Sequence, residues 1–145
     1  MKERMNIEAA EPGIYKAMDE AEKQVAAFGL DRKLVELVKL RVSQVNGCGY
    51  CVNMHSADAI KAGETQKRVF AMSAWWETPF FSPEERAAFR LAEEVTLISQ
   101  GGVTETTYQE ANKHFSESEI AQLIFIATVI NSWNRIAISV HMTAA

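Results

Sequence analysis

The sequence predicts a single all-α domain of about seven helices, centred on a helical hairpin that carries a Cys-x-x-Cys motif. Apolar residues recur at helical spacing through most of the chain. No segment shows period-two alternation, and no turn dipeptide joins two apolar strands. At 145 residues the chain is long enough to bury one core, so we expect one domain over residues 1–145.

Composition excludes several classes of protein. Hydrophobic residues make up 48% of the chain and charged residues 23%, which is ordinary for a soluble domain. The net charge of −4 and the lack of a basic run indicate no nucleic-acid partner. Residues 1–11 are polar and acidic, without the apolar core of a signal peptide. We predict a mobile arm there, a cytoplasmic location and no membrane partner.

The first helix should follow this arm. Pro12 suits its start and Gly29 its end. Its apolar positions repeat at helical spacing, at Ile14, Met18, Ala21, Val25 and Phe28. We expect this helix to cover the hairpin as a lid or packing layer.

The hairpin itself is predicted from caps and breakers. Asp31 is a good N-cap for a helix over residues 32–45, and Asn46-Gly47 is a strong breaker. A second helix over residues 49–62 should stop at Gly63. Two helices joined by so short a turn must fold back on one another.

Folding back at residues 45–46 brings Glu36 level with His55, so the carboxylate should meet the imidazole. Cys51 and His55 lie four residues apart and leave the same helix face. Cys48 lies at the helix start, where the dipole favours an anion. In this arrangement the thiol is the nucleophile, the histidine is its base and the carboxylate orients the histidine. Both cysteines are therefore predicted to favour the thiolate.

Other roles for the two cysteines are possible. Zinc normally takes four ligands, and Cys48, Cys51 and His55 supply three, with Glu36 an uncommon fourth. A structural disulfide across so small a loop would stabilise little, and two inert core thiols remain an alternative. We favour redox chemistry at a Cys48–Cys51 disulfide, with no metal and no cofactor.

The spacing of Glu36, Cys48, Cys51 and His55 resembles the signature of the AhpD-like alkylhydroperoxidases, in the carboxymuconolactone decarboxylase family. The resemblance extends over the run GLDRKLVELVKLRVSQVNGCGYCVNMHSADAIKAGE and the later INSWNRIAISVH. The best-known AhpD proteins have a histidine directly before the second cysteine, where this chain has Tyr50. The resemblance implies a lipoyl-type or thioredoxin-like dithiol reductant and assembly as a trimer or hexamer.

Four further helical segments are expected after the hairpin. A helix over residues 65–75 leads into the run WWETPFF, which is either a core-filling corner or a pocket wall or subunit contact. Ser82-Pro83 begins the next helix, which Gly101-Gly102 ends. A short helix over residues 104–113 follows, and Ser116 with Glu119 forms a capping box.

The last helix, predicted over residues 120–130, is apolar almost all round and too short to span a membrane. Asn131 and Ser132 are expected to interrupt it, either at a kink, which we favour, or as a polar edge beside the cysteine pocket. So much apolar surface predicts a homo-oligomer. The candidate pocket residues are Tyr50, Trp75, Trp76, Asn131, Trp133 and Asn134.

Three functions compete at this point. The first is a thiol peroxidase, in which Cys51 attacks a hydroperoxide, His55 is the base, Glu36 orients it and Cys48 resolves the sulfenic acid. The second is a lyase or decarboxylase of the same family, and the third is a redox-sensing or disulfide-exchange module without peroxide turnover. Helix position favours Cys48 as the attacking thiol, whereas the base favours Cys51, which we choose.

Overall fold

The computed structural model describes residues 2–144 and confirms the all-α class. Within those residues it contains no strand and eight α-helices with two short 3-10 segments. The elements in order are α1 (Ile7–Ala10), α2 (Pro12–Ala27), α3 (Arg32–Asn46), α4 (Gly49–Lys61), α5 (Gln66–Ala71), η1 (Met72–Glu77), α6 (Pro83–Thr96), η2 (Ile98–Gln100), α7 (Glu105–Asn112) and α8 (Glu117–Val140).

The hairpin forms as the sequence predicts. The Asp31 side chain accepts a hydrogen bond from the backbone N–H of Lys33, which caps α3. Gly47 ends α3 in the left-handed region at φ 70°, a conformation that costs glycine little. Only Gly47 and Cys48 separate α3 from α4, so the two helices pack against each other directly.

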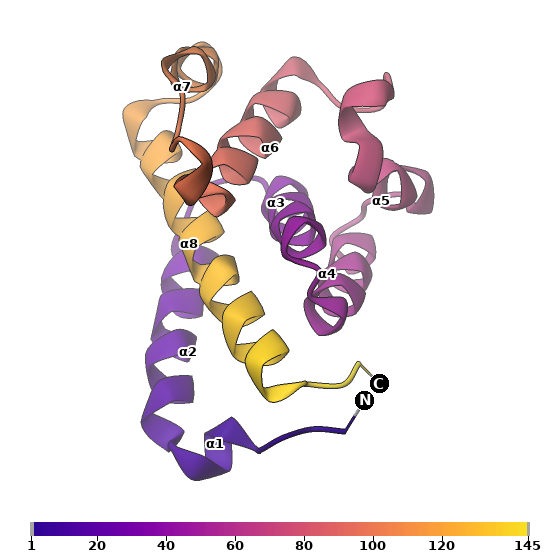
Figure 1. Ribbon diagram of the computed structural model, residues 1–145. Helices are drawn as coiled ribbons and strands as arrows, with labels where there is room; N and C mark the ends of the chain where they lie inside the picture. The colour runs from indigo at the N-terminus through magenta and orange to yellow at the C-terminus, as the bar shows by residue number, and fades with distance from the viewer. Residues whose placement is uncertain (1, 145) are drawn as a thin grey trace.

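Helix α8 is the central element, and it packs against α2, α3, α4, α6 and α7 (Figure 1). Ser116 and Glu119 form the predicted capping box. The expected interruption at Asn131 and Ser132 is wrong, because α8 continues as one helix to Val140. Both side chains instead hydrogen-bond to backbone carbonyls one turn earlier, at 2.8 Å and 3.1 Å, without breaking the helix.

The true length of α8 also corrects the argument that it is too short for a membrane. It has 24 residues, and an 18-residue window has a mean hydropathy of 1.5. Half of that window is buried inside the domain, against the helices that surround α8. This burial is typical of the core helix of a soluble protein.

Helix α2 packs along α8 and also borders the hairpin, where Glu22 accepts from Lys39 of α3 at 2.7 Å. Tyr15 of α2 packs edge to face on Trp133 of α8, with ring centroids 5.2 Å apart. The predicted arm contains α1, and Arg4 hydrogen-bonds to the carbonyls of Val140 and Ser139 at the end of α8. The two ends of the chain therefore lie close together (Figure 1).

The run WWETPFF begins inside the 3-10 segment η1, which replaces the last part of the expected 65–75 helix. Trp75 and Phe81 are buried and both pack against Phe89 of α6. Trp76 is 45% exposed. The corner therefore fills the core at Trp75 and Phe81 and presents Trp76 on the surface.

Candidate active site

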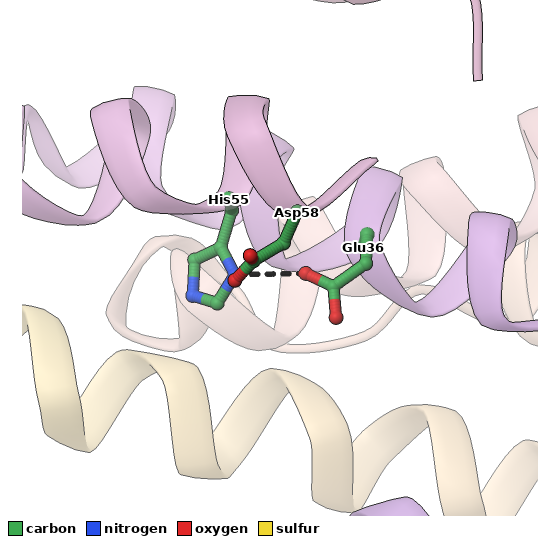
Figure 2. A group of neighbouring side chains, drawn as sticks. All are labelled: Glu36, His55 and Asp58. Atoms are coloured by element: carbon green, nitrogen blue, oxygen red, sulfur yellow. Dashed lines mark hydrogen bonds and ion pairs between the residues drawn. The ribbon is translucent and has the colours of Figure 1, made fainter. Parts of the chain in front are cut away.

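The predicted contact between Glu36 and His55 is confirmed. His55 Nδ1 lies 2.9 Å from Glu36 Oε2, across the α3–α4 hairpin (Figure 2). Both residues are buried. A carboxylate accepts hydrogen bonds, so Nδ1 carries the proton and donates it. In a neutral ring Nε2 is then the nitrogen with the free lone pair, and this atom is buried without a hydrogen-bond partner among residues 2–144.

Asp58 adds a second carboxylate beside the same histidine, and sequence reasoning missed it. One ligand atom from each of Glu36, His55 and Asp58 lies within 4.8 Å of the others (Figure 2). Asp58 follows His55 by three residues on α4, so the helical spacing alone predicts this proximity. Glu36 accepts the hydrogen bond from Nδ1, and Asp58 places a second carboxylate nearby.

Glu36 also reaches a groove on the far side of the hairpin. A cavity of about 690 Å³ between α2 and α3 is lined by Glu36 together with Val35, Lys39, Phe28 and residues of α2. Glu36 thus contacts His55 and also borders the groove between α2 and α3.

Cys48 and Cys51 lie at the start of α4 as buried free thiols. The Cys48 side chain is the N-cap of this helix, and its sulfur accepts the backbone N–H of Cys51 at 3.4 Å. Backbone donors at a helix N-terminus stabilise negative charge. Cys48 therefore has the helix-start position that the sequence predicts.

The expectation that Cys51 favours the thiolate is wrong for the resting state. The pKa of Cys51 is raised to about 12. Burial of the thiol is the largest cause, and a hydrogen bond with Cys48 is the second. A hydrogen bond from Asn134 acts in the opposite direction and lowers this pKa. The Cys51 thiol is thus protonated at neutral pH, and its reaction as a nucleophile requires a base.

Each cysteine opens onto its own cavity. Cys51 lines a pocket of about 140 Å³ with a mostly apolar wall, formed by Tyr15, Tyr50, Met54, Trp133, Ala137 and Met142. Cys48 lines a pocket of about 280 Å³ between the start of α4 and the end of α8, with Gly47, Gly49, Ile138 and His141. Tyr50, Ala137 and Met142 belong to both walls and divide the two pockets.

Residues 12–94 match the carboxymuconolactone decarboxylase family. A relative from Bacillus subtilis, the uncharacterized protein YdfG, is 41% identical over 145 residues, which cover 100% of this chain and 99% of YdfG. The chain belongs to the carboxymuconolactone decarboxylase family. Its fold is AhpD-like. The crystal structure of ATU0492 from Agrobacterium tumefaciens superimposes with a TM-score of 0.97 and 33% identity over 99% of both chains. ATU0492 is a protein of unknown function that has been linked to AhpD-type antioxidant defence.

A similar fold occurs in a protein with a different activity. The debrominase Bmp8 matches with a TM-score of 0.85 at 20% identity, over 94% of this chain and 74% of Bmp8. At that identity the likeness shows the fold alone. The fold therefore does not select the substrate, and the side chains of this family member must be considered individually.

The six candidate pocket residues have different positions. Tyr50 and Trp133 line the Cys51 pocket. Asn134 is completely buried beside Cys51 and hydrogen-bonds to Asn46 and Ser43. Asn131 accepts from the same Asn46 amide as Asn134 and lines a separate pocket with Val95 and Arg135.

Trp75 and Trp76 line neither cysteine pocket. The Trp75 indole donates to Glu93 Oε1 at 2.8 Å, and Trp76 lies beneath the Arg41 guanidinium at 5.4 Å. Sequence reasoning missed Tyr15, Met54 and Met142. The positions of Tyr15 and Met142 at the Cys51 pocket depend on how α2 and the chain end pack across α8. Met54 follows Cys51 by three residues on α4, so Met54 and Asp58 are the missed residues that follow from local spacing.

Proposed function

We propose that this protein is a thiol-dependent peroxidase that reduces hydroperoxides through a Cys48–Cys51 disulfide cycle. The observation that carries the proposal is the Glu36–His55 pair, which leaves Nε2 of a buried imidazole free on the helix face that holds Cys51. A protonated, buried thiol beside an apolar pocket needs such a base before it can attack.

The proposed cycle has three steps, which are oxidation of Cys51, formation of the disulfide and its reduction. The Cys51 thiol transfers its proton to His55, and the thiolate attacks the terminal oxygen of the hydroperoxide. The O–O bond breaks, Cys51 becomes a sulfenic acid, and the alkoxide takes a proton to leave as an alcohol. The Cys48 thiol then attacks the Cys51 sulfur, which releases water and forms the disulfide. An external dithiol reduces this disulfide and is itself oxidised.

The two pockets support the division of labour between the thiols. The smaller, apolar pocket reaches Cys51 and suits the organic part of a hydroperoxide. The larger pocket reaches Cys48, where a dithiol of the lipoyl or thioredoxin type would approach the disulfide. Cys51 is accordingly the attacking thiol and Cys48 the resolving thiol.

The test is consumption of several hydroperoxides with a panel of dithiols, in the wild type and in Cys51→Ser. The proposal predicts turnover with at least one pair in the wild type and none in Cys51→Ser. Reversible disulfide formation without turnover would instead indicate a redox-sensing or disulfide-exchange module. Activity that survives in a Cys48→Ser, Cys51→Ser double variant would indicate lyase chemistry.

Assembly and location belong to the same proposal. Large apolar side chains on the surface include Phe70 at 75% exposed, Ile98 at 59% and Trp76 at 45%. Exposed apolar groups of this size favour a homo-oligomer. The family resemblance implies a trimer or hexamer, and the proposed location is the cytoplasm. Light scattering at micromolar concentration tests the assembly, and a monomer would contradict it.

A further inference from the structure

A hydrogen-bond network with a buried centre connects the ends of α3 and α6 with the middle of α8. Its members are Asn46, Asn131, Asn134, Ser43, Thr96 and Arg135. Asn134 lies at the centre and has no exposed surface. A buried amide needs partners for its donors and acceptor, and the partners here determine its direction.

Two contacts of Asn131 determine which atoms donate and which accept in the network, because each involves a partner that can only donate or only accept. Arg135 donates to Asn131 Oδ1 at 2.7 Å, and a guanidinium never accepts. The Asn131 amide nitrogen donates to the backbone carbonyl of Ala127 at 2.8 Å, and a carbonyl never donates. These two contacts fix which side-chain atom of Asn131 is oxygen.

Asn46 transmits this direction from Asn131 to Asn134. Its side-chain nitrogen donates to Asn131 Oδ1 at 2.9 Å and to Asn134 Oδ1 at 2.8 Å, which uses both of its protons. If the Asn134 amide were reversed, two nitrogens would face each other without an acceptor. Asn134 therefore presents its oxygen to Asn46.

Ser43 fixes the other side of the Asn134 amide. Its hydroxyl donates to the carbonyl of Lys39 at 2.8 Å, so its oxygen can only accept from Asn134 Nδ2, at 3.1 Å. One N–H of Asn134 remains, and Asn134 lies near enough to Cys51 to lower the pKa of its thiol. The neighbours of Asn134 on α8 agree with this placement, because Trp133 and Ala137 line the Cys51 pocket.

We propose that Asn134 is a further catalytic residue, whose fixed amide N–H stabilises the Cys51 thiolate as it forms and attacks. The proposal rests on the peroxidase cycle described above and adds a donor to the base. No cationic side chain lines the Cys51 pocket in the described part of the chain. The oriented amide stabilises the thiolate in place of such a cation. A donor that is already oriented in a site without water needs no reorganisation during the reaction. Asn46, Ser43 and Arg135 are positioning residues for it.

The experiment follows alkylation of Cys51 by iodoacetamide between pH 6 and 10, in a Cys48→Ser background so that one thiol reacts. Asn134→Leu keeps approximate size and removes the donor. Loss of a hydrogen bond to a charged group should slow alkylation at pH 8 by roughly tenfold to a hundredfold and displace the pH profile upward. Asn134→Asp, which replaces the donor with an acceptor, should also slow it.

Ile130→Val is the matched control, because Ile130 is completely buried one turn earlier on α8 and has no part in the network. Ile130→Val should lower the stability of the fold but leave the pH dependence of the Cys51 alkylation rate unchanged. Circular dichroism identifies any variant that fails to fold, and the isosteric Asn134→Asp then replaces Asn134→Leu. Alkylation profiles of both Asn134 variants that coincide with Ile130→Val would overturn the role of Asn134. Alkylation involves no peroxide, so this result is independent of whether the protein turns over hydroperoxides.

Discussion

Two buried carboxylates on neighbouring helices have opposite surroundings. Glu93 of α6 accepts hydrogen bonds from Arg41 at 2.7 Å, from the Trp75 indole at 2.8 Å and from Arg90 at 3.2 Å. Among residues 2–144, Oε2 of Glu36 on α3 has a single protein partner, the Nδ1 of His55 at 2.9 Å. Glu93 is thus held by donors alone, whereas Glu36 is paired with an imidazole, whose second nitrogen can accept a proton.

The difference distinguishes a structural pair from a reactive one. Arg41 and Trp75 cannot give up a proton near neutral pH, so Glu93 can only stabilise the contact between α3, η1 and α6. An imidazole has one nitrogen that donates and one that accepts, and Nε2 of His55 has no partner among residues 2–144. An unsatisfied buried nitrogen is a cost to folding that a structural pair avoids. Its presence on α4, one turn after Cys51, is therefore an indication of function.

The largest effect should come from the reactive pair. His55→Asn keeps a group that can donate to Glu36 but removes the base at the Nε2 position. Peroxide-dependent oxidation of Cys51 should slow by roughly a hundredfold or more, because general base catalysis is lost. Stopped-flow measurement of the first turnover detects this directly. Glu36→Gln should show a smaller loss in the same assay. Wild-type rates in both variants would contradict the roles of His55 as base and of Glu36 as the residue that orients it.

The structural pair should give the reverse pattern. Glu93→Gln leaves Arg41 without its counter-charge, which should lower the free energy of unfolding by about 2 kcal/mol. Urea unfolding measures that loss, and the rate of Cys51 oxidation per folded molecule should stay unchanged. If the oxidation rate falls as far as it does in Glu36→Gln, the distinction between the two carboxylates fails.

A smaller effect should appear at alkaline pH. Burial raises the pKa of Cys51 from 9.0 to about 12, so above pH 9 the folded state binds more protons than the unfolded state. Stability should then fall as pH rises from about 9 towards 12, by at most about 1.4 kcal/mol per pH unit for one thiol. Thermal unfolding of the wild type and of Cys51→Ser tests this. Equal slopes in the two proteins would show that the Cys51 thiol does not titrate differently on folding.

Local patterns in the sequence predict the hairpin and its acid–base pair. Asp31, Gly47 and the four-residue spacing of Cys51 and His55 are short-range signals, and the fold-back position at residues 45–46 is sufficient to align Glu36 with His55. The sequence also predicts the capping box at Ser116. These features depend on neighbouring residues alone.

Features that depend on tertiary packing were not predictable in this way. The expected break at Asn131 assumed that freed backbone groups need polar partners, yet the amide joins Thr96, Asn46 and Arg135 within an unbroken helix. The raised pKa of Cys51 results from burial under α8. The position of Cys51 along α4 does not predict this burial. Tyr15 reaches the Cys51 pocket only because α2 lies along α8.

Trapping of the sulfenic acid tests the central claim most directly. Cys48→Ser and Cys51→Ser are each treated with one equivalent of hydroperoxide in the presence of a dimedone-type trap, and the labelled residue is identified by mass spectrometry. Attack by Cys51 predicts a label at Cys51 in Cys48→Ser and little label in Cys51→Ser. A label at Cys48 in Cys51→Ser, with none at Cys51 in Cys48→Ser, would contradict the account and make Cys48 the thiol that His55 serves.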